Sequence, residues 1–238
     1  MSTIQISRTK LFEQVAAHLE RQILNGDLKP GDRLPAERDL QTMFGVGRPA
    51  IREALITLQR AGLIEIGNGA PAKVAMPTAS GVLSGMQPAV MHMLTTEKGQ
   101  HHFQRARLFF ECGLARHCAQ NGMDADFAAL KAALAANEAA IGNRASFVAT
   151  DIAFHFVLAR AMNNPFFTAL HDAISEWLRL QRTVTLNAPN QERVAYEAHQ
   201  AIYNAITKRD PDAAEAAMRD HLIQLEDTFW RETSEHVS

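Results

Sequence analysis

The chain contains 238 residues, of which 47% are hydrophobic and 21% are charged, and its formal net charge is −2. This composition is typical of a folded globular protein and excludes a disordered or collagen-like chain, while the length allows one or two domains. No apolar run approaches the roughly 18 residues that a membrane span requires, and no secretory signal is recognisable, so we expect a cytoplasmic protein.

Residues 31–69 contain the signals of two short helices and a hairpin in quick succession. Glu37 and Asp39 favour the start of one helix, because acidic side chains are stabilising at the positive end of the helix dipole. Gly45 is suited to end that helix and Pro49 to open the next, so the order of elements predicts a winged helix-turn-helix, which places its second helix in the major groove of DNA. The apolar side chains that we expect to be buried in this module are Leu34, Leu40, Met43, Phe44, Ile51, Ala54, Leu55 and Leu58.

Two arginines mark the start of the predicted second helix. Arg48 and Arg52 are four residues apart, so they share one face and point away from the apolar stripe. Guanidinium groups in this position can make bidentate contacts with guanine edges or with phosphate. The alternative is that they pair with Glu37, Asp39 or Glu53 on an ordinary solvated helix. Within this turn geometry, DNA recognition is the favoured interpretation.

Residues 26–74 resemble the DNA-binding domain of GntR-type bacterial transcription regulators. The matching segments cover residues 28–40, 52–55 and 62–64, so the resemblance extends over about 50 residues at high density. It implies that this module reads an operator sequence in double-stranded DNA.

The same resemblance implies a set of DNA contacts, including a wing tip that enters the minor groove. Glycine is suited to that tip, because the backbone must approach the groove floor closely. Most relatives carry Ser or Thr where Gly47 stands, and often Thr at Pro49, so a hydroxyl contact to DNA is missing here. The DNA-contacting residues that the resemblance implies are Arg38, Arg48, Pro49, Arg52, Asn68 and Gly69.

A linker at residues 76–78 separates this module from a second region. Residues 1–77 contain 10 Lys and Arg against 8 Asp and Glu, whereas residues 78–238 contain 14 against 18, so the expected DNA-binding domain is the basic part. Long amphipathic patterns without strand-like runs predict an all-α bundle for residues 78–238. The expected helices span residues 79–95, 99–121, 124–141, 143–162, 164–184, 190–208 and 211–234.

Cys112 and Cys118 are the only cysteines and lie in one predicted helix. In the reducing cytosol that we expect for this chain, they are interpreted as small core residues rather than as a disulfide.

Three histidines and an aspartate form the second candidate site. Asp151 and His155 are four residues apart on one predicted helix, and His199 and His221 lie on two later helices. Three imidazoles and a carboxylate suit a divalent ion such as zinc, nickel or manganese, and helical bundles can bring such ligands together. The alternative is that they are surface or hydrogen-bonded core residues, since the chain has 10 His.

Residues 78–238 resemble the FCD effector domain of FadR-type GntR regulators. Asp151, His155, His199 and His221 fall where that family places its metal ligands, so the resemblance implies one divalent ion per chain, with zinc the first choice. The intact ligand set argues against the subtypes that bind acyl-CoA without a metal.

The resemblance also implies a small-acid effector. Arg107 matches the family arginine that meets the effector carboxylate, a task for which a planar guanidinium is suited. Glu111 would orient Arg107, although an ordinary solvated pair of the two is the alternative. Asn164 and Arg182 are further pocket candidates on the same ground. Short segments at residues 44–49, 83–86, 107–111 and 183–185 resemble the sialic-acid-responsive branch of the family.

Together these features predict a homodimeric DNA-binding repressor, not an enzyme, that a small carboxylate releases from its operator. The effector would be sialic acid, a sugar acid, a hydroxy acid or an aromatic acid. Two alternatives are a regulator that responds to the metal itself and a metal-dependent hydrolase fused to a DNA-binding module. The hydrolase is disfavoured because no nucleophile motif or phosphate loop is recognisable.

Overall fold

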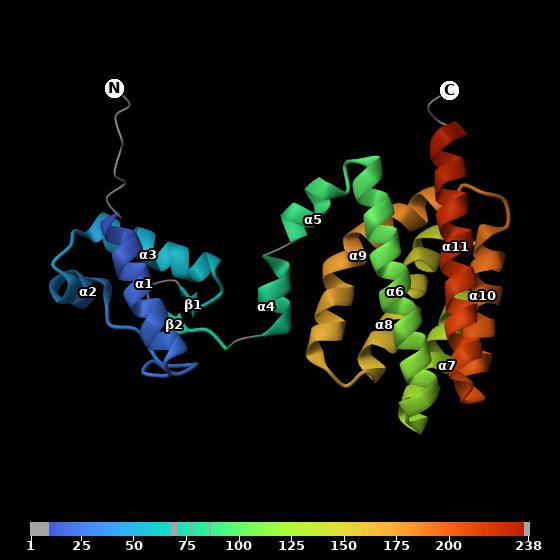
Figure 1. Cartoon of the computed structure of the whole chain (residues 1–238), viewed down its shortest axis with the longest axis horizontal. Helices are drawn as coiled ribbons and strands as arrows, with labels where there is room; N and C mark the ends of the chain where they lie inside the picture. The colour runs from blue at the N-terminus through green and yellow to red at the C-terminus, as the bar shows by residue number, and fades with distance from the viewer. Residues whose placement is uncertain (1–9, 68–70, 77, 86, 236–238) are drawn as a thin grey trace, which may run out of the picture. The chain divides into compact units, whose positions relative to one another are not determined.

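The computed structural model describes residues 10–67, 71–76, 78–85 and 87–235, which are mainly helical with one small antiparallel sheet (Figure 1). Contacts divide the chain into two compact units, Met1–Gly85 and Met86–Ser238, called unit 1 and unit 2. The fold class is the predicted one, a winged helix-turn-helix unit followed by an all-α bundle. None of the described helices combines the length and the apolarity that crossing a bilayer requires.

In unit 1, helices and a short pair of strands enclose one core. The described elements are α1 (Leu11–Leu24), α2 (Glu37–Phe44), α3 (Arg48–Arg60), β1 (Ile64–Glu65), β2 (Lys73–Val74) and α4 (Ala79–Ser84). The strands are antiparallel, with Ile64 opposite Val74 and Glu65 opposite Lys73. The buried apolar side chains are Val15, Ala16, Leu19, Leu34, Leu40, Ile51, Ala54, Leu55, Leu58, Ile64, Ala72 and Val74.

The turn between α2 and α3 follows its local signals. Gly45 ends α2 with a φ of +64°, a left-handed conformation that glycine adopts without strain. Pro49 lies in the first turn of α3, where its missing N–H costs nothing. The prediction that Met43 is buried is wrong, because on this two-turn helix Leu40 faces the core and Met43 is 60% exposed. Phe44 is half-buried and packs against the core.

Unit 2 is a helical bundle. The later helices agree with the predicted segments to within two residues at each end. The expected single helix at residues 79–95 is instead α4 and α5, because Gly85 caps the end of α4 and Pro88 lies in the first turn of α5. The predicted domain boundary at residues 77 and 78 precedes α4 and stays a prediction. The helices of unit 2 are α5 (Gln87–Met93), α6 (Glu97–Asn121), α7 (Asp124–Ala139), α8 (Arg144–Ala161), α9 (Pro165–Thr185), α10 (Gln191–Thr207) and α11 (Pro211–Glu235).

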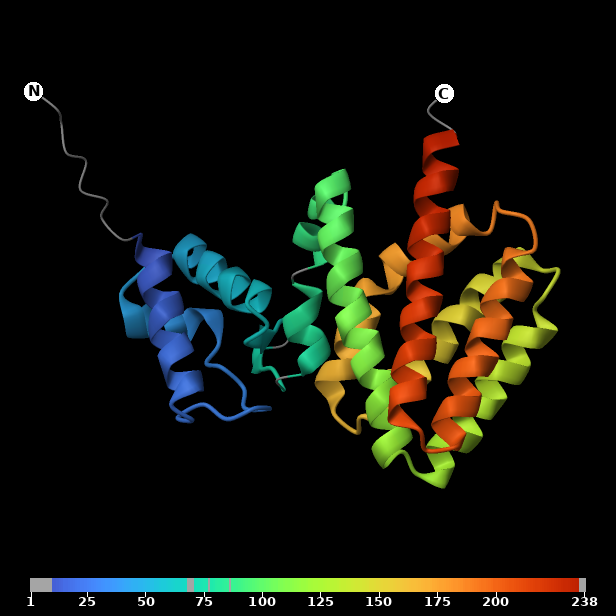
Figure 2. The ribbon, with the colours of Figure 1, turned by 45° about the vertical axis from the view of Figure 1, so that its right-hand side comes forward.

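The bundle core lies between paired helices. Helix α11 packs against both α6 and α10, and α8 packs between α7 and α9 (Figures 1 and 2). Cys112 and Cys118 are free and buried in this core, as predicted. Asp210 caps α11 by accepting a hydrogen bond from the Ala213 N–H at 3.0 Å, which is the predicted start of that helix.

Candidate functional site

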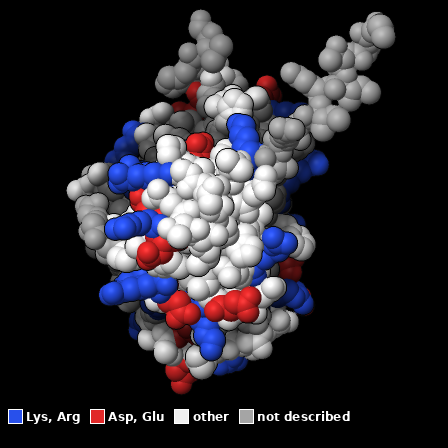
Figure 3. Space-filling view, turned by 90° about the vertical axis from the view of Figure 1, so that its left-hand side faces the viewer, with Lys and Arg blue, Asp and Glu red and all other residues white. Residues whose placement is uncertain are grey.

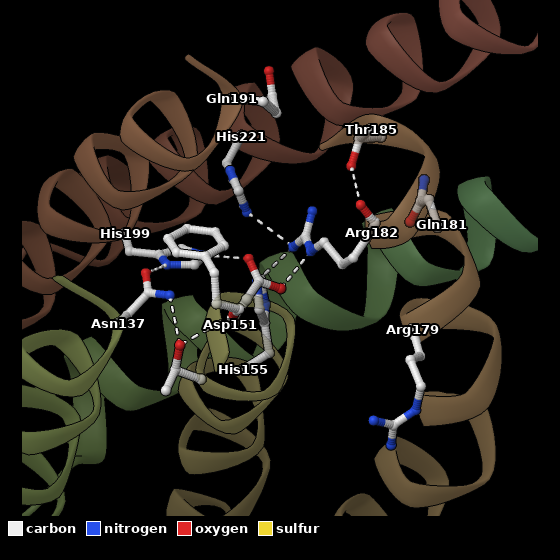
Figure 4. Close-up of polar contacts among 12 residues, drawn as sticks. Asn137, Asp151, His155, Arg179, Gln181, Arg182, Thr185, Gln191, His199 and His221 are labelled. Atoms are coloured by element: carbon white, nitrogen blue, oxygen red, sulfur yellow. Dashed lines mark hydrogen bonds and ion pairs between the residues drawn. The ribbon is translucent and has the colours of Figure 1, made fainter. Parts of the chain in front are cut away.

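The bundle brings the four predicted metal ligands together. Asp151 and His155 lie on α8, His199 on α10 and His221 on α11, and one ligand atom of each lies within 4.8 Å of the others (Figure 4). Each of the four residues is at most 2% exposed. Atoms that each lie about 2.0–2.2 Å from one zinc ion are at most about 4.4 Å apart, so this spacing is close to that of a metal site.

The His199 imidazole is oriented by a hydrogen-bond chain from α7. The Asn137 amide donates to the Thr150 hydroxyl at 3.1 Å, so its carbonyl oxygen faces His199 Nδ1 at 2.9 Å and accepts from it. His199 Nε2 is then the nitrogen with a free lone pair, and it faces Asp151 Oδ1 at 3.5 Å. Partners of this kind hold metal-binding imidazoles in the required tautomer.

A buried carboxylate links His155 to the predicted effector arginine. Glu111 Oε2 contacts His155 Nδ1, and Glu111 Oε1 accepts from Arg107 Nε at 2.5 Å. Arg107 Nη1 also donates to Gln181 Oε1 at 2.6 Å. Arg107 therefore pairs with Glu111, as the alternative interpretation expected, but both side chains are 1% exposed rather than solvated.

Arg182 lies among the four predicted metal ligands. Its Nε donates to Asp151 Oδ2, and its Nη2 lies 3.3 Å from His155 Nε2 and 3.5 Å from His221 Nε2 (Figure 4). This arginine was predicted only as a pocket residue, because nothing in the spacing of α9 indicates that it reaches α8 and α11.

Both buried carboxylates are held in their charged form. Burial raises the pKa of Asp151, but the Arg182 guanidinium and the His199 imidazole lower it by more, so the pKa lies below its ordinary value. Burial likewise raises the pKa of Glu111, and Arg107 is the main group that brings it well below the ordinary value. The cluster thus contains two carboxylates and two guanidiniums in two buried pairs.

Burial holds two of the imidazoles in the uncharged form. Burial lowers the pKa of His199 to about 3, and it lowers the pKa of His221 well below the ordinary value. An uncharged imidazole is the form that binds a metal ion, so the donor set is chemically suited to one.

Several buried donors beside the cluster have no acceptor. They come from α6 and α9, which the bond between Arg107 and Gln181 joins. A buried N–H without an acceptor is costly, so these groups suit the binding of an anion such as a carboxylate. The N–H groups that no acceptor reaches in the described part of the chain are those of Gln104 Nε2, Arg107 Nη2, Gln181 Nε2 and Arg182 Nη1.

The sequence analysis missed three buried polar residues, and one predicted pocket residue caps a helix. Asn137 is a polar position on an otherwise apolar helix face, whereas Gln104 shares the buried face of α6 with Arg107 and Glu111. Gln181 is buried on α9 four residues before the buried Thr185. Asn164 is exposed and caps α9 by accepting from the Phe166 N–H at 3.0 Å. The capping bond accounts for its position before Pro165, and its place in the effector pocket stays a prediction.

The predicted DNA-contacting side chains of unit 1 are exposed. Arg48 and Arg52 are 66% and 61% exposed, and Glu37 lies between them, 3.2 Å from Arg48 Nε and 3.7 Å from Arg52 Nε. The ion pairing that the alternative interpretation expected is therefore present, and the DNA contacts stay a prediction. Exposed pairs are weak and exchangeable, so Glu37 leaves the arginines available to phosphate or bases.

Of the other predicted DNA-contacting residues, two are exposed and two lie outside the described residues. Arg38 on α2 and Pro49 at the start of α3 are also exposed. Asn68 and Gly69 lie outside the described residues. In the view of Figure 3, Lys and Arg side chains surround a largely uncharged central area with Asp and Glu among them, in keeping with the weak charge asymmetry of the sequence.

Comparison with family models and curated proteins identifies relatives for both units. Residues 11–74 match the model described as bacterial regulatory proteins, gntR family, and residues 103–224 match the FCD domain. The HTH-type transcriptional repressor NanR of Klebsiella aerogenes is 39% identical over 95% of this chain and 87% of that protein. The protein of the same name from Citrobacter rodentium is 39% identical over 94% of this chain and 87% of its own length.

Solved structures show the same fold at lower identity. Streptococcus agalactiae GntR superposes with a TM-score of 0.60 at 23% identity, covering 89% of this chain and 97% of that chain. E. coli McbR/YncC superposes with a TM-score of 0.52 at 18% identity, covering 95% of this chain and 100% of that chain. At these identities the likeness supports the fold alone.

Proposed function

Because this chain belongs to the GntR family of bacterial regulatory proteins and carries an FCD domain, we propose that it is a cytoplasmic, homodimeric transcriptional repressor released by a small carboxylate. The relatives are transcriptional repressors rather than enzymes, in keeping with the prediction from sequence. The observation that carries the finer proposal is the buried cluster of unit 2, in which a metal ligand set adjoins donors that have no acceptor.

The DNA-binding part of the proposal rests on α3. Arg48 and Arg52 project from the first turns of a helix that follows a tight turn, so the helix end is free to enter a major groove. Two copies related by a two-fold axis would place two such helices on the half-sites of a palindromic operator. Asn68 and Gly69 are proposed minor-groove contacts on the basis of the family resemblance alone.

The metal part of the proposal rests on the donor set. Asp151, His155, His199 and His221 would hold one divalent ion, with zinc the first choice, and Glu111 and Asn137 would fix two of the imidazoles. A bound divalent ion would supply positive charge for an effector carboxylate. The metal-responsive and hydrolytic alternatives share this donor set, so they are separated by what changes operator binding.

The effector part of the proposal rests on Arg107. Its Nη2 has no acceptor among the described residues, its other nitrogens are held by Glu111 and Gln181, and all three side chains are buried. A carboxylate placed against this group would complete its hydrogen bonding. Sialic acid is the first candidate, because short segments of the chain resemble the sialic-acid-responsive branch. A ligand changes repression only if it binds one conformation more tightly than the other.

The decisive experiment measures operator binding against titrated zinc and titrated N-acetylneuraminate, each with and without the other. We expect the acid to weaken operator binding when zinc is present and to have little effect on an Arg107→Gln variant. Release by zinc alone would favour the metal-responsive alternative. If a panel of sugar acids, hydroxy acids and aromatic acids also leaves operator binding unchanged, the carboxylate effector is wrong.

Metal content provides an independent test. Elemental analysis of the purified full-length protein should show about one divalent ion per chain, strongly reduced in His199→Ala. His101→Ala is a matched control, since His101 is half-exposed and stacks on Trp230 outside the cluster. Equal metal content in all three proteins would contradict the four-ligand site.

A further inference from the structure

The guanidinium of Arg182 contacts three of the four proposed metal ligands. Its Nε donates to Asp151, and its Nη2 lies 3.3 Å from His155 Nε2 and 3.5 Å from His221 Nε2. For His155, Nε2 is the nitrogen left for a metal ion, because Glu111 contacts its Nδ1. A guanidinium and a divalent ion therefore compete for the same lone pairs.

We propose that Arg182 is a displaceable internal cation, which occupies the ligand cluster in the metal-free protein and leaves it when a divalent ion binds. Once displaced, its guanidinium faces the effector instead of Asp151. The inference rests on the proposed function, because it takes the four-ligand site as given. It adds that Arg182 competes with the metal ion for these ligands, which neither the family match nor the ligand set implies.

The balance of buried charges shows what must accompany the displacement of Arg182 by a divalent ion. The buried cluster contains two guanidiniums, Arg107 and Arg182, and two carboxylates, Glu111 and Asp151. Their charges cancel, so a divalent ion held by neutral imidazoles leaves the interior with excess positive charge. Buried excess charge is costly unless it is paired. Displaced Arg182 therefore requires an anion, and the effector carboxylate is one.

The unpaired donors show where that anion fits. Arg182 Nη1 has no acceptor in the described structure even while Nε is bound to Asp151. Arg182 is adjacent to Gln181, whose Oε1 accepts from Arg107 Nη1 at 2.6 Å. A carboxylate that accepts from both Arg182 Nη1 and Arg107 Nη2 would satisfy two donors that have no acceptor among the described residues. Metal binding and effector binding then support each other through Arg182.

The test compares zinc affinity among variants of the full-length protein, stripped of metal and titrated with Zn²⁺ against a fluorescent chelator. Arg182→Gln should bind zinc about 10- to 100-fold more tightly than the wild type, because charged hydrogen bonds need no longer be broken. Arg182→Lys, which keeps the charge but cannot make the forked contacts, should lie between them. Arg179→Gln is the matched control, because Arg179 is exposed on the same helix and lies apart from the cluster (Figure 4).

A crystal structure of the zinc-loaded wild type provides the second measurement, and it does not depend on any variant folding. We expect the bond between Arg182 Nε and Asp151 to be broken. Zinc bound with that bond intact would overturn the inference, as would equal zinc affinity in wild type and Arg182→Gln; the proposed metal site would stand in both cases. Failure of the wild type to bind zinc, nickel or manganese would refute the metal site and the inference with it.

Discussion

The two units use the same chemistry, an arginine paired with a carboxylate, in opposite surroundings. In unit 1, Glu37 lies between Arg48 and Arg52 in solvent. In unit 2, Arg182 pairs with Asp151 in the interior, where both side chains are at most 2% exposed. A solvated pair exchanges readily for a phosphate, whereas a buried pair can be broken only by a group that replaces its charge. The first suits DNA binding and the second suits a switch.

The largest expected effect comes from breaking the buried pair. Asp151→Asn in metal-free protein should lower the free energy of unfolding by about 3–5 kcal/mol, because it leaves the Arg182 guanidinium buried without a counter-charge. Urea unfolding in the presence of chelator measures this. Glu37→Gln is the matched change in unit 1 and should cost less than about 1 kcal/mol, because its pairs are exposed and screened. Similar losses in the two variants would remove the contrast between the units.

A smaller effect should follow from removing the partner of a metal ligand. Asn137→Ala should weaken zinc binding by about 10- to 100-fold, because the His199 imidazole loses the acceptor that fixes its tautomer. Chelator competition measures the affinity. Thr150→Val, which removes only the hydroxyl behind Asn137, should have a smaller effect of the same sign. Unchanged affinity in Asn137→Ala would mean that the hydrogen bond does not orient the ligand.

An effect of comparable size is expected in unit 1, on operator binding rather than on zinc binding. Arg52→Ala should weaken binding to a specific operator by about 1–3 kcal/mol if the guanidinium contacts a base edge. Fluorescence anisotropy at several salt concentrations measures both the affinity and its salt dependence. An equal loss on unrelated DNA would instead assign Arg52 to phosphate contact. No loss on either DNA would remove it from the interface.

The smallest effect concerns pH and a buried histidine outside the ligand set. Burial lowers the pKa of His171 from an ordinary 6.5 to about 4. Because the folded-state pKa is depressed, its contribution to stability is present above pH 6.5 and is lost as the pH falls toward 4. Lowering the pH from 7.5 to 5.5 should therefore cost the wild type about 1 kcal/mol more than His171→Gln, measured by urea unfolding. Equal pH dependence in the two proteins would contradict this.

Local signals were sufficient for most elements of the fold. Gly45, Pro49 and Asp210 end or begin helices through their own backbone and side-chain preferences, so the helix boundaries could be predicted within a few residues. One error occurred where packing decides, and the other where local helix-ending signals were overlooked. Met43 is apolar but faces solvent, and Gly85 with Pro88 divides a segment whose apolar pattern looked continuous.

The sequence indicated which four residues lie together in the cluster of unit 2, but not what surrounds them. Asp151 and His155 share a helix face by their spacing, His199 and His221 were added because imidazoles suit a divalent ion, and the family resemblance supplied Arg107. Nothing local indicates that Asn137, 62 residues from His199, orients it.

The sequence by itself indicated a winged helix-turn-helix followed by an all-α bundle, because these depend on residue type and short-range periodicity, and the resemblance carried by its motifs indicated the family. Only the tertiary structure decided which charges neutralise one another. Arg182 lies 31 residues from Asp151 in the chain, and their pairing arises because α8 and α9 pack together and bury both groups. Electrostatic partners in a protein interior are chosen by packing, and packing is not encoded in the spacing of any one helix.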